Sequence, residues 1–193
     1  TAPTSIYTLS LHDALPISQS TDWRTGLYAG GLLNAYERQG RKFTLGGPAL
    51  FLRHLSAGAW DNAFINFDHT GWFPAPNYIV MKLWWDNFAP QLLPVTGDPQ
   101  GCNVVATRSE DGRTLVIKAV NPVGQIRNVE VDLNGDFAPT TASMQRVAPG
   151  SLRARNTLAE PTTVRVDSGE VQLNGRRVRF ELPAYSVAVV RLN

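Results

Sequence analysis

The chain has 193 residues, with 18 lysines and arginines against 16 aspartates and glutamates, and a formal net charge of +2. No run of basic residues stands out from the mixed charges, so the composition does not indicate a nucleic-acid partner. The single cysteine, Cys102, excludes an internal disulfide and a metal site built from cysteines, and the longest apolar run, within residues 182–190, contains Pro and Ser and is too short to span a bilayer.

The first residues do not read like native protein. Residues 6–18, IYTLSLHDALPIS, resemble the translation of a short-read sequencing adapter. We therefore leave residues 1–18 out of the reasoning about fold, and His12 and Asp13 out of the reasoning about chemistry. Native sequence is expected to begin near Gln19. The natural protein is then expected to be longer at its N-terminus, and the missing part can include catalytic residues.

A first amphipathic helix is predicted after Thr21 and Asp22, which are both good N-cap residues, and it is expected to end before Gly40. Gly30 and Gly31 in its middle cost about 1 kcal/mol each relative to alanine, so their expected use is to let a neighbouring element approach closely. The apolar residues that recur at helical spacing are Tyr28, Leu32, Ala35 and Tyr36.

A short strand is predicted over residues 42–45, followed by a Gly-Gly-Pro break and an apolar stretch over residues 49–55. A second helix is predicted to begin at Pro76 and to end at Ala89 and Pro90. This alternation of helix, strand, long loop and helix is typical of βα units, in which the loops beyond the strand ends carry function. Two helices alone cannot close such a domain. The expected buried face of the second helix consists of Val80, Leu83, Trp84 and Phe88.

The segment between these elements is the most informative part of the sequence, because four of the five tryptophans lie within residues 59–85. Trp and Phe on a polar loop offer flat apolar faces to sugar C–H groups, and neighbouring Asn and Asp can bind hydroxyl groups. A carbohydrate-processing surface is one interpretation. A buried aromatic cluster at a domain junction is the other, and the residues alone favour neither.

Beyond Val95 the periodicity changes to two, which indicates half-buried antiparallel strands over residues 128–133 and 177–182. The run over residues 114–120 is apolar nearly throughout and suits a strand covered on both faces. About eight short strands separated by turns predict a β-sandwich of jelly-roll type. The turn signals are Asp111-Gly112, Asn134-Gly135, Ser168-Gly169 and Asn174-Gly175.

The ordered motifs resemble the C-terminal part of α-L-arabinofuranosidases of glycoside hydrolase family 51. In the first half the matching stretches are GLYAGGLLNAYERQG, KFTLGGPALFLRH, WDNAFINFD and PAPNYIVMKLWWDNFAP, and in the sandwich they are NPVGQ, NTLAEP and LPAYSVAVV. They cover nearly all of residues 23–193. Each motif alone is loose, but their order and spacing make chance agreement improbable.

The resemblance implies α/β plus all-β architecture: the end of an eight-stranded β/α barrel followed by an antiparallel β-sandwich of jelly-roll type. Residues 1–18 would be the adapter-like segment, residues 19–90 the last βα units of the barrel, and residues 91–193 the C-terminal sandwich. Residues 23–39 would form the seventh barrel helix, residues 42–55 the eighth strand and its extension, and residues 76–88 the eighth helix.

The resemblance also implies an activity, which is the release of terminal α-L-arabinofuranosyl groups with retention by two glutamates. Retention needs two carboxyl groups about 5 Å apart, one attacking the anomeric carbon and one protonating the leaving oxygen. In the family both lie upstream of the helix that begins near Trp23, so this chain is expected to lack them and to be inactive. Glu37, at a helix end opposite the active face, is not expected to be the nucleophile. No cofactor is expected.

Three residues are the substrate-binding candidates. Trp60 and Asn62 would line the sugar pocket, because some family members place an amide two residues after a tryptophan to contact arabinose, and Asn62 can both donate and accept. Trp72 would form an outer rim, with packing at the domain junction as its alternative. Trp84 and Trp85 are expected at the seam between the domains, with at most one of them facing the core.

Other polar residues are not expected to carry chemistry. Asp61, Asp68, His54 and His69 lack the spacing of a metal site, and a triad of Ser56, His54 and Asp61 has no nucleophile elbow to support it. The expected partners are arabinose-containing glycans, without nucleic acid or membrane, and oligomers are common in the family. The sequence leaves linkage preference and localisation open. Two alternatives remain: another barrel glycosidase such as a xylosidase, and a carbohydrate-binding or purely structural accessory sandwich.

Overall fold

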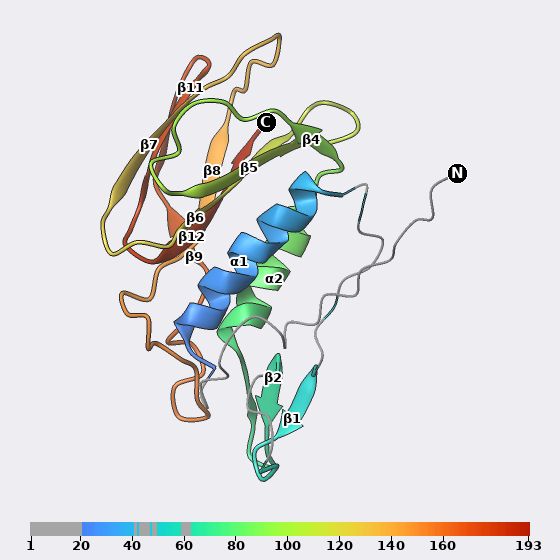
Figure 1. The fold of residues 1–193 in the computed structure, drawn as a ribbon, viewed down its shortest axis with the longest axis vertical. Coiled ribbons are helices and arrows are strands. Elements are labelled where there is room, and N and C mark those ends of the chain that lie inside the picture. Colours follow the sequence, from blue (N-terminus) through green and yellow to red (C-terminus); the bar gives the residue numbers. More distant parts are fainter. Residues whose placement is uncertain (1–20, 41, 43–46, 48–49, 59–62) are drawn as a thin grey trace.

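The computed structural model describes residues 21–193 except residues 41, 43–46, 48–49 and 59–62. Two helices and twelve strands are present in this part of the chain, in the order shown in Figure 1. The helices are α1 (Trp23–Arg38) and α2 (Pro76–Asp86). Neither described helix is long and apolar enough to cross a membrane. The strands of the first half are β1 (Leu52–His54), β2 (Ile65–Phe67) and β3 (Trp72–Pro74).

The second half of the chain forms a sandwich of two antiparallel sheets. A six-stranded sheet has the order β4-β5-β6-β12-β8-β9, and a three-stranded sheet has the order β10-β11-β7. The sandwich predicted from the period-two pattern is therefore confirmed. Its strands are β4 (Gln91–Leu93), β5 (Asn103–Arg108), β6 (Leu115–Asn121), β7 (Arg127–Asp132), β8 (Ala142–Val147), β9 (Asp167–Gly169), β10 (Val171–Asn174), β11 (Arg177–Leu182) and β12 (Ser186–Leu192).

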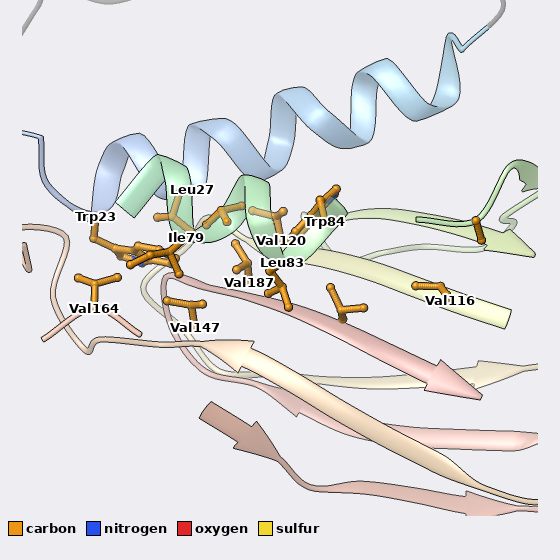
Figure 2. Packing of buried hydrophobic residues seen from close by; sticks show 13 residues of the cluster. Trp23, Leu27, Ile79, Leu83, Trp84, Val116, Val120, Val147, Val164 and Val187 are labelled. Carbon is orange, nitrogen blue, oxygen red and sulfur yellow. The ribbon is translucent and has the colours of Figure 1, made fainter. Parts of the chain in front are cut away.

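The six-stranded sheet is covered on both faces, so the molecule has three layers. Alternate residues of β6 and β12 point to opposite sides, as the pleat of a strand requires. One set packs against α1 and α2, and Figure 2 shows Val120 and Val187 of this set in one cluster with Leu27 and Leu83. The other set, including Ile117 and Val190, packs against the three-stranded sheet. All residues of β6 are buried, which confirms the strand covered on both faces.

The start of α1 is as predicted, but its buried face is not. Asp22 caps the helix by accepting from the Arg24 amide at 3.2 Å, and Trp23 is fully buried. A Cβ at Gly30 would lie 3.0 Å from a methyl group of Val120, so this glycine does permit a close approach. The small residues therefore mark the side facing the sheet. The face predicted to be apolar, Tyr28, Leu32, Ala35 and Tyr36, is only half-buried among the described residues.

α2 begins at Pro76 as predicted and ends at Asp86, short of Ala89. Val80, Leu83 and Trp84 are buried as expected, but Phe88 is 65% exposed, because it follows the end of the helix and no longer keeps the helical spacing. The strand predicted over residues 42–45 lies almost wholly outside the described residues. The turn predicted at Ser168-Gly169 is wrong, because these residues belong to strand β9, which pairs with β8.

Candidate functional site

The candidate site lies on the small sheet formed by β1, β2 and β3. β1 and β2 are parallel, and β2 and β3 are antiparallel. The register places His54 opposite Phe67 and Phe67 opposite Trp72. Because directly opposed residues point to the same face of a sheet, these three rings form one line across the strands, which we call the aromatic row. The His54 and Phe67 rings meet edge to face, with their centroids 5.3 Å apart.

The aromatic row lies on the more open face of this sheet. Trp72 is 62% exposed, His54 is exposed and Phe67 is half-buried. On the other face, Asn66 is buried and its side-chain amide contacts the Ala63 carbonyl at 3.4 Å. A large exposed indole therefore stands beside a second aromatic ring, an arrangement that can stack against the apolar face of a sugar.

The turn between β2 and β3 is braced by Asp68. Its Oδ1 accepts from the Thr70 amide at 2.7 Å, the Thr70 hydroxyl at 2.6 Å and the Gly71 amide at 3.2 Å. The hydrogen bonds from Thr70, chiefly that of its hydroxyl, hold the pKa of Asp68 below its usual value because they favour the charged form. Asp68 is thus a turn residue, in agreement with its expected structural role.

A second group of rings joins the segments before β1 and β2 to the start of α2. Phe51, Phe64 and Tyr78 come from the segment before β1, the segment before β2 and the first turn of α2, and their centroids are 5.8–6.4 Å apart. Phe64 is buried, whereas Phe51 is exposed. The sequence reasoning did not single out Phe51 or Tyr78. Their aromatic character was the only available signal, since the strands that bring them together are three residues long.

Of the three predicted substrate-binding residues, the structure places one. Trp72 lies on β3 and is 62% exposed, and its role, outer rim or junction packing, stays a prediction. Trp60 and Asn62 fall outside the described residues, so their role stays a prediction. Asp61, which would complete a triad with Ser56 and His54, also falls outside the described residues.

His54 and Ser56, two members of the triad considered from the sequence, meet in a local turn. His54 Nδ1 and Ser56 Oγ are 2.7 Å apart, but Nδ1 also lies 3.3 Å from the Ser56 amide nitrogen, which makes this a local turn contact between residues two apart in sequence. No group of three His, Cys, Asp or Glu side chains in the described part of the chain could hold a metal ion.

Polar contacts join α1 to the sandwich at the far end of the helix from Trp23. Lys118, on the helix-facing side of β6, is fully buried and donates to Glu37. Burial lowers the pKa of Lys118, and the Glu37 carboxylate opposes that shift. Arg38 donates to the Asn103 side chain at 2.8 Å. Glu37 is therefore committed to a structural ion pair at this seam.

The tryptophan pair of α2 divides between the core and the surface. Trp84 is buried and donates from its indole nitrogen to Asn34 Oδ1 at 2.9 Å, whereas Trp85 is 79% exposed. This agrees with the expectation that at most one of the two faces the core, but the expectation that Trp85 packs at the seam is wrong for the described residues, because its side chain points away from the other layers. Trp84 thus holds α2 against α1 and the sheet.

The sequence matches the family described as the alpha-L-arabinofuranosidase C-terminal domain over residues 10–186. The chain belongs to this family. The matched range begins inside the adapter-like segment, whose foreign origin stays a prediction. A search of curated proteins finds no match for the chain.

Solved structures of family 51 enzymes have the same fold as this member of the family. An arabinose-bound family 51 α-L-arabinofuranosidase superposes with a TM-score of 0.81 at 18% identity, covering 90% of this chain and 28% of that one. The family 51 α-L-arabinofuranosidase from Thermotoga petrophila gives a TM-score of 0.77 at 18% identity, covering 89% of this chain and 38% of that one.

The fold is not confined to family 51. The catalytic domain of the family 30 xylanase C from Talaromyces cellulolyticus superposes with a TM-score of 0.66 at 15% identity, covering 97% of this chain and 38% of that one. At such identities the likeness concerns the fold alone. The chain thus spans about 28–38% of the length of these structures.

Proposed function

We propose that this chain is the C-terminal part of a retaining α-L-arabinofuranosidase that releases terminal arabinofuranosyl groups from arabinose-containing polysaccharides or oligosaccharides. The observation that carries the proposal is the match to the arabinofuranosidase C-terminal family over residues 10–186. Residues 19–90 would supply the last βα units of the catalytic barrel.

The reaction needs two carboxyl groups that this chain is proposed to lack. In a retaining hydrolysis one carboxylate attacks the anomeric carbon while the other carboxyl group protonates the departing oxygen, and water then cleaves the glycosyl ester with the second group acting as base. Glu37 is unsuited to either role because it is paired with buried Lys118 at the C-terminal end of α1. Both glutamates would lie upstream, so this chain is proposed to be inactive by itself.

The contribution of this chain would be one wall of the sugar pocket. Loops at the carboxyl ends of barrel strands, where the following helices begin, line the active site of such folds. The hairpin of β2 and β3 leads directly into the start of α2 at Pro76, which puts Trp72 at that end. Trp72 is proposed to stack on an arabinose-bearing glycan, with Trp60 and Asn62 nearer the reacting sugar.

The activity of the complete protein decides between an arabinofuranosidase and a xylosidase. Once the upstream coding sequence is recovered, the full-length enzyme is expected to hydrolyse an α-L-arabinofuranoside with retention and to leave a β-xyloside uncleaved. The 193-residue chain, assayed in parallel, is expected to hydrolyse neither. Preferential cleavage of the xyloside would support the xylosidase alternative, and activity of the short chain would show that catalytic residues lie within it.

The accessory binding module is the second candidate, and the faces of the sandwich argue against it. The helices cover one side of the six-stranded sheet. The exposed residues of β7 and β11 form ion pairs, such as Arg179 with Glu130 at 2.6 Å. Among the described residues after 90, the exposed large apolar side chains are aliphatic: Leu92, Val95, Ile126 and Val166. Flat sugar-binding platforms are built from aromatic rings, so this surface lacks their usual chemistry.

Affinity electrophoresis of the whole chain in gels with arabinan or xylan separates the two candidates. Retardation that the Trp72→Ala substitution abolishes would place binding on the aromatic row and support the pocket-wall role. Retardation that survives this substitution would place binding on the sandwich and support the accessory module.

A further inference from the structure

The loop between β8 and β9 leaves the sandwich and reaches the candidate site. Residues 148–166 run beside the start of α1, where the orange segment in Figure 1 descends below the sheets. The Ala154 carbonyl in this loop accepts from the Trp23 amide at 2.8 Å. Val164, near the other end of the loop, is buried against the same core, beside Trp23 in Figure 2. The loop is thus fixed to the helical layer at both ends.

Asn156 lies at the centre of this loop with its side chain fully engaged. Its Nδ2 donates to the Val164 carbonyl at 3.0 Å and to the Pro74 carbonyl at 3.1 Å, and its Oδ1 accepts from the Val164 amide at 2.7 Å. The residue is 4% exposed. A carboxylate of the same size would direct oxygens at two carbonyl groups, so the site requires the two donors and one acceptor of an amide.

The same loop comes close to the hairpin at a second point, just before β3. Leu158 Cδ2 lies 3.7 Å from the position that a Cβ at Gly71 would take, so the Leu158 side chain is next to this glycine. Gly71 precedes Trp72, and Pro74 follows it by two residues. The loop therefore binds the strand after the exposed indole and lies next to the residue before it.

We propose that Asn156 is a positioning residue of the sugar site: by holding the Pro74 carbonyl, it fixes β3 and thereby the orientation in which Trp72 is presented. That Trp72 belongs to a sugar site rests on the proposed function, whereas the structural link from Asn156 to Trp72 does not depend on it. Through this link the sandwich would contribute to substrate binding by positioning Trp72, without contacting the sugar itself. Trp72, with its side chain mostly in solvent, has few contacts of its own to hold it, so its orientation depends on the backbone beneath it.

Hydrogen exchange and fluorine NMR of the 193-residue chain test this link. The chain is labelled with 5-fluorotryptophan, and the Trp72 signal is assigned by its loss in Trp72→Phe. In Asn156→Ala the Trp72 signal is expected to shift and broaden, and the amides of residues 64–75 are expected to exchange about tenfold faster, as the loss of a hydrogen bond predicts. Leu158→Ala, which removes the contact at Gly71 but keeps the buried amide, is expected to move the same signals less.

The matched control is Asn121→Ala. Asn121 is also a fully buried asparagine whose Nδ2 donates to backbone carbonyl groups, those of Gln125 and Pro183 at 2.8 Å, but it does not contact β3. Its substitution is expected to lower global stability and to leave the Trp72 signal in place. A general loss of stability would instead affect the hairpin equally in both alanine variants, and that result would overturn the proposal.

Titration of the unsubstituted chain with arabino-oligosaccharide keeps the two proposals apart. If Trp72 responds to Asn156→Ala but not to the sugar, the positioning link is supported and the proposed sugar contact fails. If Trp72 responds to the sugar while both loop variants leave its signal and the exchange of residues 64–75 unchanged, the positioning proposal is overturned and the sugar contact is supported. Should Asn156→Ala fail to fold, Leu158→Ala alone decides: an unchanged hairpin overturns the link.

Discussion

Replacing Glu37 with glutamine is expected to destabilise the chain by about 3–5 kcal/mol, the cost of removing one partner of a buried ion pair. The pair joins the last turn of α1 to the middle of the central strand β6. The Lys118 side chain is 0% exposed and that of Glu37 is 16% exposed. Without the carboxylate the ammonium group would remain in an apolar layer with no compensating charge.

The upper limit of this loss follows from the alternative open to Lys118, which is to give up its proton. At pH 7 that costs about 4.6 kcal/mol, because each pH unit below the ordinary lysine pKa of about 10.4 costs about 1.36 kcal/mol. Lys118→Met is expected to cost a similar amount, since it leaves the Glu37 carboxylate without its cation and Glu37 Oε2 is already buried without a hydrogen-bond partner. The double substitution Glu37→Leu and Lys118→Met is expected to restore most of the loss.

Urea unfolding at pH 7, followed by tryptophan fluorescence, measures these differences. Lys82→Met is the control, because Lys82 and Asp86 form an exposed ion pair on α2 and its loss is expected to leave the urea midpoint unchanged. A loss below about 1 kcal/mol for Glu37→Gln or for Lys118→Met would refute the reasoning about the buried pair.

The same pair gives a pH dependence with a definite sign. Because burial lowers the pKa of Lys118, the folded chain releases this proton at a lower pH than the unfolded chain. Between the two pKa values the unfolded state binds more protons, so the Lys118 contribution to the free energy of unfolding rises with pH up to about 10.4. Lys118→Met is expected to remove this contribution. An unchanged alkaline slope in that variant would contradict the assignment.

Three further experiments test the packing. Gly30→Ala is expected to lower the free energy of unfolding by about 1–2 kcal/mol, because its Cβ would lie 3.0 Å from a β6 methyl group. Gly31→Ala, whose Cβ would have its nearest contact at 3.5 Å, is expected to raise the free energy of unfolding. Equal urea midpoints for the two variants would refute this. Trp84→Phe leaves a buried amide oxygen unpaired and is expected to cost about 1–3 kcal/mol, while Trp85→Phe should change stability by less than about 0.5 kcal/mol. The buried Cys102 thiol, whose pKa burial raises, is expected to react with iodoacetamide at least about tenfold more slowly in the folded than in the urea-unfolded chain, and equal rates would contradict its burial.

The sandwich could be predicted because its strands obey a local rule. In β11 polar and apolar residues alternate from Arg177 to Leu182, and the structure buries every second one. In β6 the run is apolar on both sides, and both faces are covered. Lys118 interrupts that run, but its partner Glu37 is distant in sequence, so no local pattern indicates that the lysine is buried and paired.

The candidate site was only partly predictable for a related reason. Trp72 stood out by residue type alone. Its neighbours His54 and Phe67 did not, because their alignment depends on the pairing register of three short strands. The brace at Asn156 comes from another domain of the predicted division, and nothing near it in sequence indicates that it contacts Pro74. Side chains that act across domains need the fold before they can be recognised.

The position of β12 has a consequence for synthesis on the ribosome. This strand follows the other eight strands of the sandwich in sequence, yet it lies between β6 and β8 and pairs with both. Until residues 186–192 have emerged, β6 and β8 each have an unpaired edge, and α1 and α2 lack part of the surface on which they pack. Packing of α1 and α2 on the sheet can therefore be completed only after β12 has been synthesised, and a chaperone that shields apolar edges would act during that interval.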